Sequence, residues 1–137
     1  MIIVVGYIPT PEGTAAFEQA RETARENKGR MIVLNTGHHG NNNHPNFASA
    51  HDLDAIAKEL TEFGIAHDIH QPGDARSAAG LIVDTAREMD ADLIVIGLRR
   101  RSPVGKVLGG STAQAVLLDA GCPVLAVKAG QRLVVGG

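Results

Sequence analysis

The chain of 137 residues carries a net charge of −2 at pH 7 and contains a single cysteine. This length predicts one domain, the charge argues against general nucleic-acid binding, and one cysteine excludes an intramolecular disulfide. Hydrophobic residues make up 44% of the chain and aromatic residues only 3%, so the core must consist of Val, Ile, Leu and Ala, as in a buried parallel sheet.

No segment resembles an export signal or a membrane span. The first residues, Met1 to Gly6, lack the basic and apolar regions of a signal peptide. No apolar run approaches the roughly 20 residues that a membrane span needs, and a lone cysteine fits a reducing compartment. We therefore expect a cytoplasmic protein that does not bind membranes.

Segments of strand and helix character alternate from the N-terminus. The run Ile2–Val5 predicts a strand that cannot continue past Pro9. A helix is expected to begin with Thr10 as its N-cap and Pro11 at its first position. Its buried face is marked by residues at helical spacing: Ala16, Phe17, Ala20 and Ala24.

The next unit has the same order. Met31–Leu34 predicts a strand, and 36–47, rich in His, Asn and Gly, predicts a loop. A helix ended by Gly64 is expected from the spacing of Leu53, Ile56, Ala57, Leu60 and Phe63. The alternation in Ile65–His70 is typical of a half-exposed strand near a sheet edge.

The remaining elements complete the alternation. Asp74 is expected to cap a helix that buries Ala78, Ile82, Ala86 and Met89. The most hydrophobic run, Leu93–Ile96, predicts a central strand. A short helix over Ser111–Asp119 and a strand over Val124–Val127 are also expected, and the tail segment Leu133–Val135 is expected either to add a strand or to fray.

This order predicts an α/β fold, an open, mostly parallel five-stranded sheet with helices on both faces. In such sheets ligands bind beyond the carboxyl ends of the strands, where the strand order reverses. The residues that follow each strand are therefore the first candidates for a site.

The segment Gly97–Thr112 carries the strongest functional pattern. It holds three arginines and a lysine, and Gly109-Gly110 lead directly into the predicted helix at Ser111. Free N–H groups at a helix N-terminus bind anions, and arginine donates to phosphate oxygens in pairs. We interpret the segment as a phosphate-binding loop; the alternative is a surface loop whose cations are only solvated.

The same segment resembles the signature of the universal stress protein family, in which glycine, two residues, glycine, nine residues and Gly-Ser or Gly-Thr follow in order. Gly97 opens the pattern and Gly110-Ser111 close it. The segments 91–97 and 121–127 resemble the family's fourth and final strands, and the resemblance covers about residues 1–128.

The resemblance implies a Rossmann-like domain over 1–128, similar to the adenine nucleotide alpha hydrolases, followed by a tail over 129–137. It implies a regulatory protein that binds ATP, ADP or AMP, the triphosphate with Mg²⁺, and forms a homodimer through the last strand. No catalytic residue is assigned and any hydrolysis is expected to be slow, because no base is evident to activate water. The nucleotide-binding residues that it implies are Gly6, Tyr7, Ile8, Leu34, Thr36, Ile96, Gly97, Arg99, Arg100, Gly110, Ser111 and Thr112.

Two positions depart from the family pattern. Arg100 stands where the family has its second glycine, and Gly6-Tyr7 stand where ATP-binding members usually carry an aspartate that engages the sugar. These departures favour an alternative, a dimeric member that binds a partner in place of ATP. A third hypothesis, a nucleotidyl transferase of related architecture, lacks a general base or a carboxylate cluster near the loop.

Other motifs point less clearly to chemistry. Lys106 is followed by Val107, so Gly105-Lys106 does not form a P-loop. His38, His39 and His44 share a loop without a cysteine or carboxylate, so no metal site is predicted there. We expect Cys122 to be a buried structural residue.

Overall fold

Strands and helices alternate strictly through the computed structural model, which describes residues 1–35, 45, 47–72, 76–99 and 110–129. In chain order the elements are β1 (Ile2–Gly6), α1 (Pro11–Asn27), β2 (Arg30–Leu34), α2 (Ala50–Glu62), β3 (Ala66–His70), α3 (Ala78–Glu88), β4 (Leu93–Leu98), α4 (Ser111–Asp119) and β5 (Val124–Lys128).

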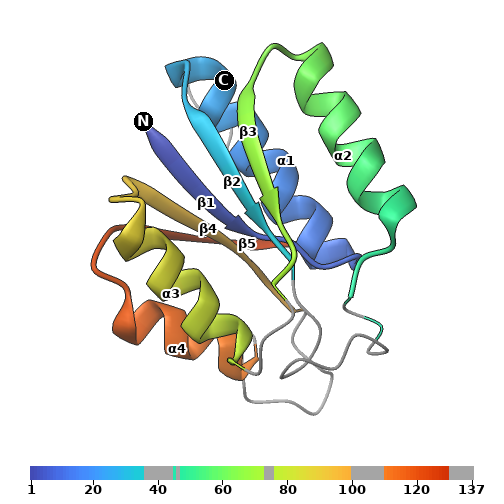
Figure 1. Cartoon of the computed structure of the whole chain (residues 1–137). Helices are drawn as coiled ribbons and strands as arrows, with labels where there is room; N and C mark the ends of the chain where they lie inside the picture. The colour runs from blue at the N-terminus through green and yellow to red at the C-terminus, as the bar shows by residue number, and fades with distance from the viewer. Residues whose placement is uncertain (36–44, 46, 73–75, 100–109, 130–137) are drawn as a thin grey trace.

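The strands form one sheet in the order β3-β2-β1-β4-β5, and every pairing is parallel. Helices α1 and α2 cover one face of the sheet, and α3 and α4 cover the other (Figure 1). The predicted α/β architecture is therefore confirmed, with a sheet that is parallel throughout. The chain crosses from one half of the sheet to the other between β3 and β4, so the strand order reverses between β1 and β4.

The alternation of side chains along β1 divides the core into two layers. Ile3 and Val5 pack with α1 and α2, whereas Val4 packs with α3 and α4. Val4 is fully buried and lies opposite Ile32 of β2 and Ile94 of β4. Strands covered on both faces must be apolar on both, which explains the continuous hydrophobic runs in the sequence.

Several local predictions are confirmed. Thr10 caps α1, and its Oγ1 accepts a hydrogen bond from Gly13 N at 3.1 Å. Gly64 follows α2 with a φ of +70°, a backbone conformation that glycine adopts most readily. Strand β3 lies at the edge of the sheet that the described strands form, next to β2 alone.

Strand β4 is paired on both of its edges, as expected of a central strand, and β1 is the middle strand of the sheet. One prediction needs correction. The N-cap of α3 is Ser77, whose Oγ accepts from Gly80 N at 3.0 Å, because this hydroxyl stands directly before the first helical residue. Asp74 and the tail Leu133–Val135 lie outside the described residues.

Cys122 is half-buried, whereas the sequence predicted a buried residue. Burial raises the pKa of its thiol, and the negative charge of Asp92 adds to this effect. A raised pKa disfavours the reactive thiolate form of this cysteine. Within the parts of the chain that the structure describes, no helix is long and apolar enough to cross a membrane.

Candidate functional site

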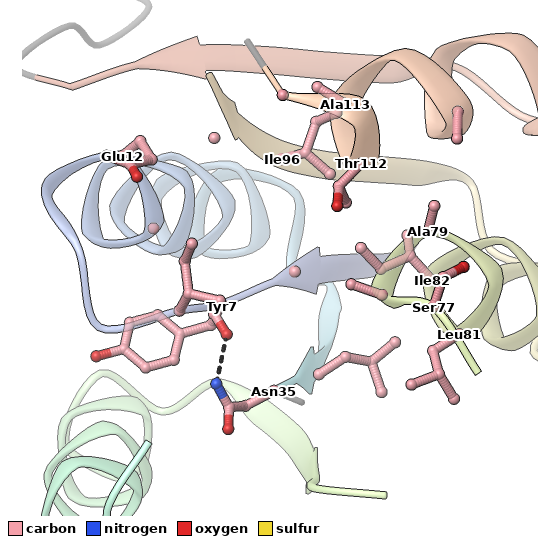
Figure 2. Close-up of a pocket in the computed structure, with 18 of the residues that line it drawn as sticks. Tyr7, Glu12, Asn35, Ser77, Ala79, Leu81, Ile82, Ile96, Thr112 and Ala113 are labelled. Atoms are coloured by element: carbon pink, nitrogen blue, oxygen red, sulfur yellow. Dashed lines mark hydrogen bonds between the residues drawn. The ribbon is translucent and has the colours of Figure 1, made fainter. Parts of the chain in front are cut away.

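A cavity of about 590 Å³ opens at the carboxyl ends of β1 and β4, where the strand order reverses (Figure 2). This is the position at which open α/β sheets bind their ligands. Every predicted site residue that the structure describes lines it: Gly6, Tyr7, Ile8, Leu34, Ile96, Gly97, Arg99, Gly110, Ser111 and Thr112. Thr36 and Arg100 lie outside the described residues.

The N-terminus of α4 faces this cavity without a side-chain cap. Its N-cap residue, Gly110, is extended, with φ −104° and ψ −179°, and has no side chain to accept from the first turn. Helices α1, α2 and α3 are instead capped by Thr10, Ser49 and Ser77. No side chain in the described part of the chain caps the first N–H groups of α4, so they are suited to an anion, which the helix dipole also attracts.

Arg99 adds a permanent positive charge beside these N–H groups. A Cβ atom built on Gly110 would lie 3.1 Å from Arg99 Nη2 and 3.5 Å from its Nε, so the guanidinium covers the N-cap. A cation at the positive end of a helix dipole is unfavourable unless an anion joins them. The juxtaposition of Arg99 with α4 therefore favours an anionic ligand.

Gly97 allows the first turn of α1 to approach β4. A side chain there would collide with the carbonyl of Glu12, and one at Gly13 would collide with the carbonyl of Ile8. This packing gives Gly97 a structural role in addition to its place in the motif. It also places Glu12 in the cavity wall, a residue that the sequence did not identify as part of the site.

Tyr7 contributes to the wall mainly through its main chain. Its side chain is 9% exposed and packs edge-to-face on Phe17, with ring centroids 6.2 Å apart. Burial raises the pKa of its phenol, and the charge of Asp52 adds to this effect. In Figure 2 its carbonyl accepts a hydrogen bond from Asn35 Nδ2, at 2.9 Å.

Asn35 holds the wall in place and was not among the predicted residues. It is 1% exposed, and its Oδ1 accepts from Ala48 N and from Gln71 Nε2, both at 2.9 Å. With its bond to Tyr7 it ties together the ends of β1, β2 and β3. An amide directly after an apolar strand was the available signal in the sequence.

Helix α3 supplies an apolar side of the cavity that the sequence did not indicate. Figure 2 shows Ala79, Leu81 and Ile82 on this side, across from Tyr7. Such residues look like ordinary helix core in the sequence, and only the crossover places them at the site. Apolar walls with a few polar groups are typical of small-molecule sites.

The described residues offer no ready metal centre. No group of three or more His, Cys, Asp or Glu side chains among them could hold an ion. His38, His39 and His44 fall outside the described ranges. The cavity's own charged groups, Arg99 and Glu12, are instead suited to direct contact with a ligand.

Comparison with known proteins gives consistent results. The sequence profile of the universal stress protein family matches residues 1–128. A universal stress protein from Mycolicibacterium smegmatis is 38% identical over 128 residues, which cover 93% of this chain and 97% of that relative.

Two solved structures extend this similarity to the fold. A universal stress protein from Archaeoglobus fulgidus is 30% identical, with a TM-score of 0.77 over 93% of this chain and 98% of its own. A structure from the same organism, in complex with dAMP, is 23% identical, with a TM-score of 0.68 over 93% and 98% of the two chains. The family profile and the relative thus confirm the sequence resemblance, and the solved structures confirm the fold.

Proposed function

This chain belongs to the universal stress protein family, and we propose that its cavity binds an adenine nucleotide in a regulatory role. The observation that carries the proposal is the uncapped N-terminus of α4 beside Arg99, at the point where the strand order reverses. This arrangement suits the phosphate group of a nucleotide.

The remaining walls suit the nucleoside half. Leu34, Ala79 and Ile82 offer apolar surface to a base, and the cavity volume of about 590 Å³ lies within the range of small-molecule sites. The bound dAMP of the Archaeoglobus fulgidus relative supports adenine as the base. AMP, ADP and ATP are all candidates, and ATP would bring Mg²⁺ on its own phosphates.

Isothermal titration calorimetry tests this function. The purified chain is titrated with AMP, ADP and ATP, the last with and without Mg²⁺, and with ribose 5-phosphate to separate phosphate from base recognition. We expect adenine nucleotides to bind more tightly than ribose 5-phosphate. Absence of binding at millimolar nucleotide would refute the proposal.

A second candidate function, partner binding as a homodimer, rests on the edge beyond β5. Among the described strands, β5 has a neighbour on one side only, and the adjacent helix α4 exposes Leu117 by 52% and Leu118 by 84%. We propose that a second copy pairs along β5 and covers this apolar surface. Light scattering of Leu118→Glu tests it: we expect monomers, against dimers for the unaltered chain, and monomers for both would contradict the proposal.

A further inference from the structure

Glu12 is the one carboxylate among the described residues that line the cavity. It lies in the first turn of α1, and its main chain is held against Gly97 by the close packing described above. Its carboxylate makes no hydrogen bond or ion pair with any described residue. Among the residues that line the cavity, Glu12 therefore offers an acceptor that no other described residue uses.

Two other side-chain acceptors around the cavity, those of Asn35 and Ser77, already receive hydrogen bonds. Asn35 Oδ1 receives two donors, and Ser77 Oγ receives Gly80 N. The phenol of Tyr7 is packed in the core beside Phe17. Ser111 and Thr112 lie at the start of α4, where a phosphate is expected.

A carboxylate in a cavity built for an anion restricts what can lie beside it. It would repel a phosphate, and it attracts neutral groups that donate hydrogen bonds. The neutral donors nearest to the phosphate of a nucleotide are the ribose hydroxyls. A bond from a hydroxyl to a carboxylate is charge-assisted and therefore among the stronger kinds.

We propose that Glu12 accepts hydrogen bonds from the 2′- and 3′-hydroxyls of the bound nucleotide and so selects ribonucleotides. This rests on the proposed nucleotide function and identifies which sugar the site takes. The residue determines specificity, because it discriminates between ligands that share the same phosphate and base.

The test compares the affinities of AMP and 2′,3′-dideoxy-AMP for the unaltered chain, Glu12→Ala and Glu18→Ala. Glu18 is the matched control, a carboxylate of the same helix that does not line the cavity. We expect AMP to bind about 10-fold or more tightly than the dideoxy form, as a charge-assisted hydrogen bond would give. Glu12→Ala should bring this ratio close to one, and Glu18→Ala should leave it unchanged.

The outcomes separate the two proposals. If no chain binds AMP, the proposed function fails and this inference with it. If AMP binds and Glu12→Ala keeps the ratio of the unaltered chain, only the inference is wrong. The inference is also overturned if Glu12→Ala changes the ratio of the affinities for AMP and IMP but not the ratio for AMP and dideoxy-AMP. Glu12 would then face the base and not the sugar.

Discussion

At the scale of residues, the charge of the cavity depends on where a few side chains lie. Arg99 lies over the N-cap of α4, and Glu12 lies in the first turn of α1. Opposite charges in separate parts of one cavity can orient a ligand that has an anionic end and a hydroxylated middle.

Replacing Arg99 with alanine should weaken AMP binding by about 10- to 100-fold, because hydrogen bonds to a charged group contribute about 1.5 to 3 kcal/mol. Arg87→Ala is the matched control, since its side chain is 70% exposed on α3 and does not line the cavity. Calorimetry measures both variants. Equal losses in the two would contradict a phosphate contact for Arg99.

Tyr7 should lose its proton at a higher pH in the folded chain than in the unfolded one. Burial, and then the charge of Asp52, raise its pKa above the ordinary value of 10.0. The resulting stability is complete below the unfolded pKa and is lost as the pH rises through the folded pKa. The chain has one tyrosine and no tryptophan, so ultraviolet absorbance reports this residue alone. Equal midpoints with and without urea would disprove the shift.

At the scale of elements, α4 differs from α1, α2 and α3 because it begins at the cavity with a glycine as its N-cap. A helix gains stability from a side-chain cap, so an uncapped start has a cost that binding an anion can offset. The absence of a cap is therefore expected to matter for binding more than for folding.

Gly110→Asp tests this directly. The new carboxylate can cap α4, raising the free energy of unfolding by roughly a few tenths of a kcal/mol, while it occupies the N–H groups and repels phosphate. We expect AMP affinity to fall at least about 10-fold. Gly121→Asp is the control, because a Cβ atom there meets nothing within 4 Å. Undiminished binding by Gly110→Asp would place the phosphate elsewhere.

Local patterns in the sequence predicted many elements but not all of their limits. Thr10, Pro11 and Gly64 are signals that act within a few residues, and the structure bears them out. The start of α2 was missed because its capping box, Ser49 with Asp52, follows a loop without periodicity. Ser77 was overlooked for a different reason, because Asp74 is an equally good N-cap residue in the sequence.

At the scale of the whole molecule, the cavity forms because segments far apart in the sequence meet. The sequence predicted the residues after β1 and β4 but not the strand order that makes these strands neighbours. Strand order depends on pairing across the fold, which no local pattern records. The apolar wall from α3 and the carboxylate of Glu12 were missed for the same reason.

Binding should stabilise the whole domain. A ligand that binds only the folded chain adds about 2.7 kcal/mol at a concentration of 100 Kd. Thermal unfolding with increasing AMP should therefore show a rising Tm, and Arg99→Ala should require more AMP for the same rise. A Tm that does not respond to AMP would contradict binding to the folded state.

The central claim is that the phosphate of an adenine nucleotide lies at the start of α4. Amide NMR of the labelled chain titrated with AMP tests it most directly. We predict the largest shifts at the N–H groups of Ser111, Thr112 and Ala113, with smaller ones at Gly97 and Asn35, and little change along the β3 edge. Unchanged amides at 111–113 with saturating AMP would contradict the account.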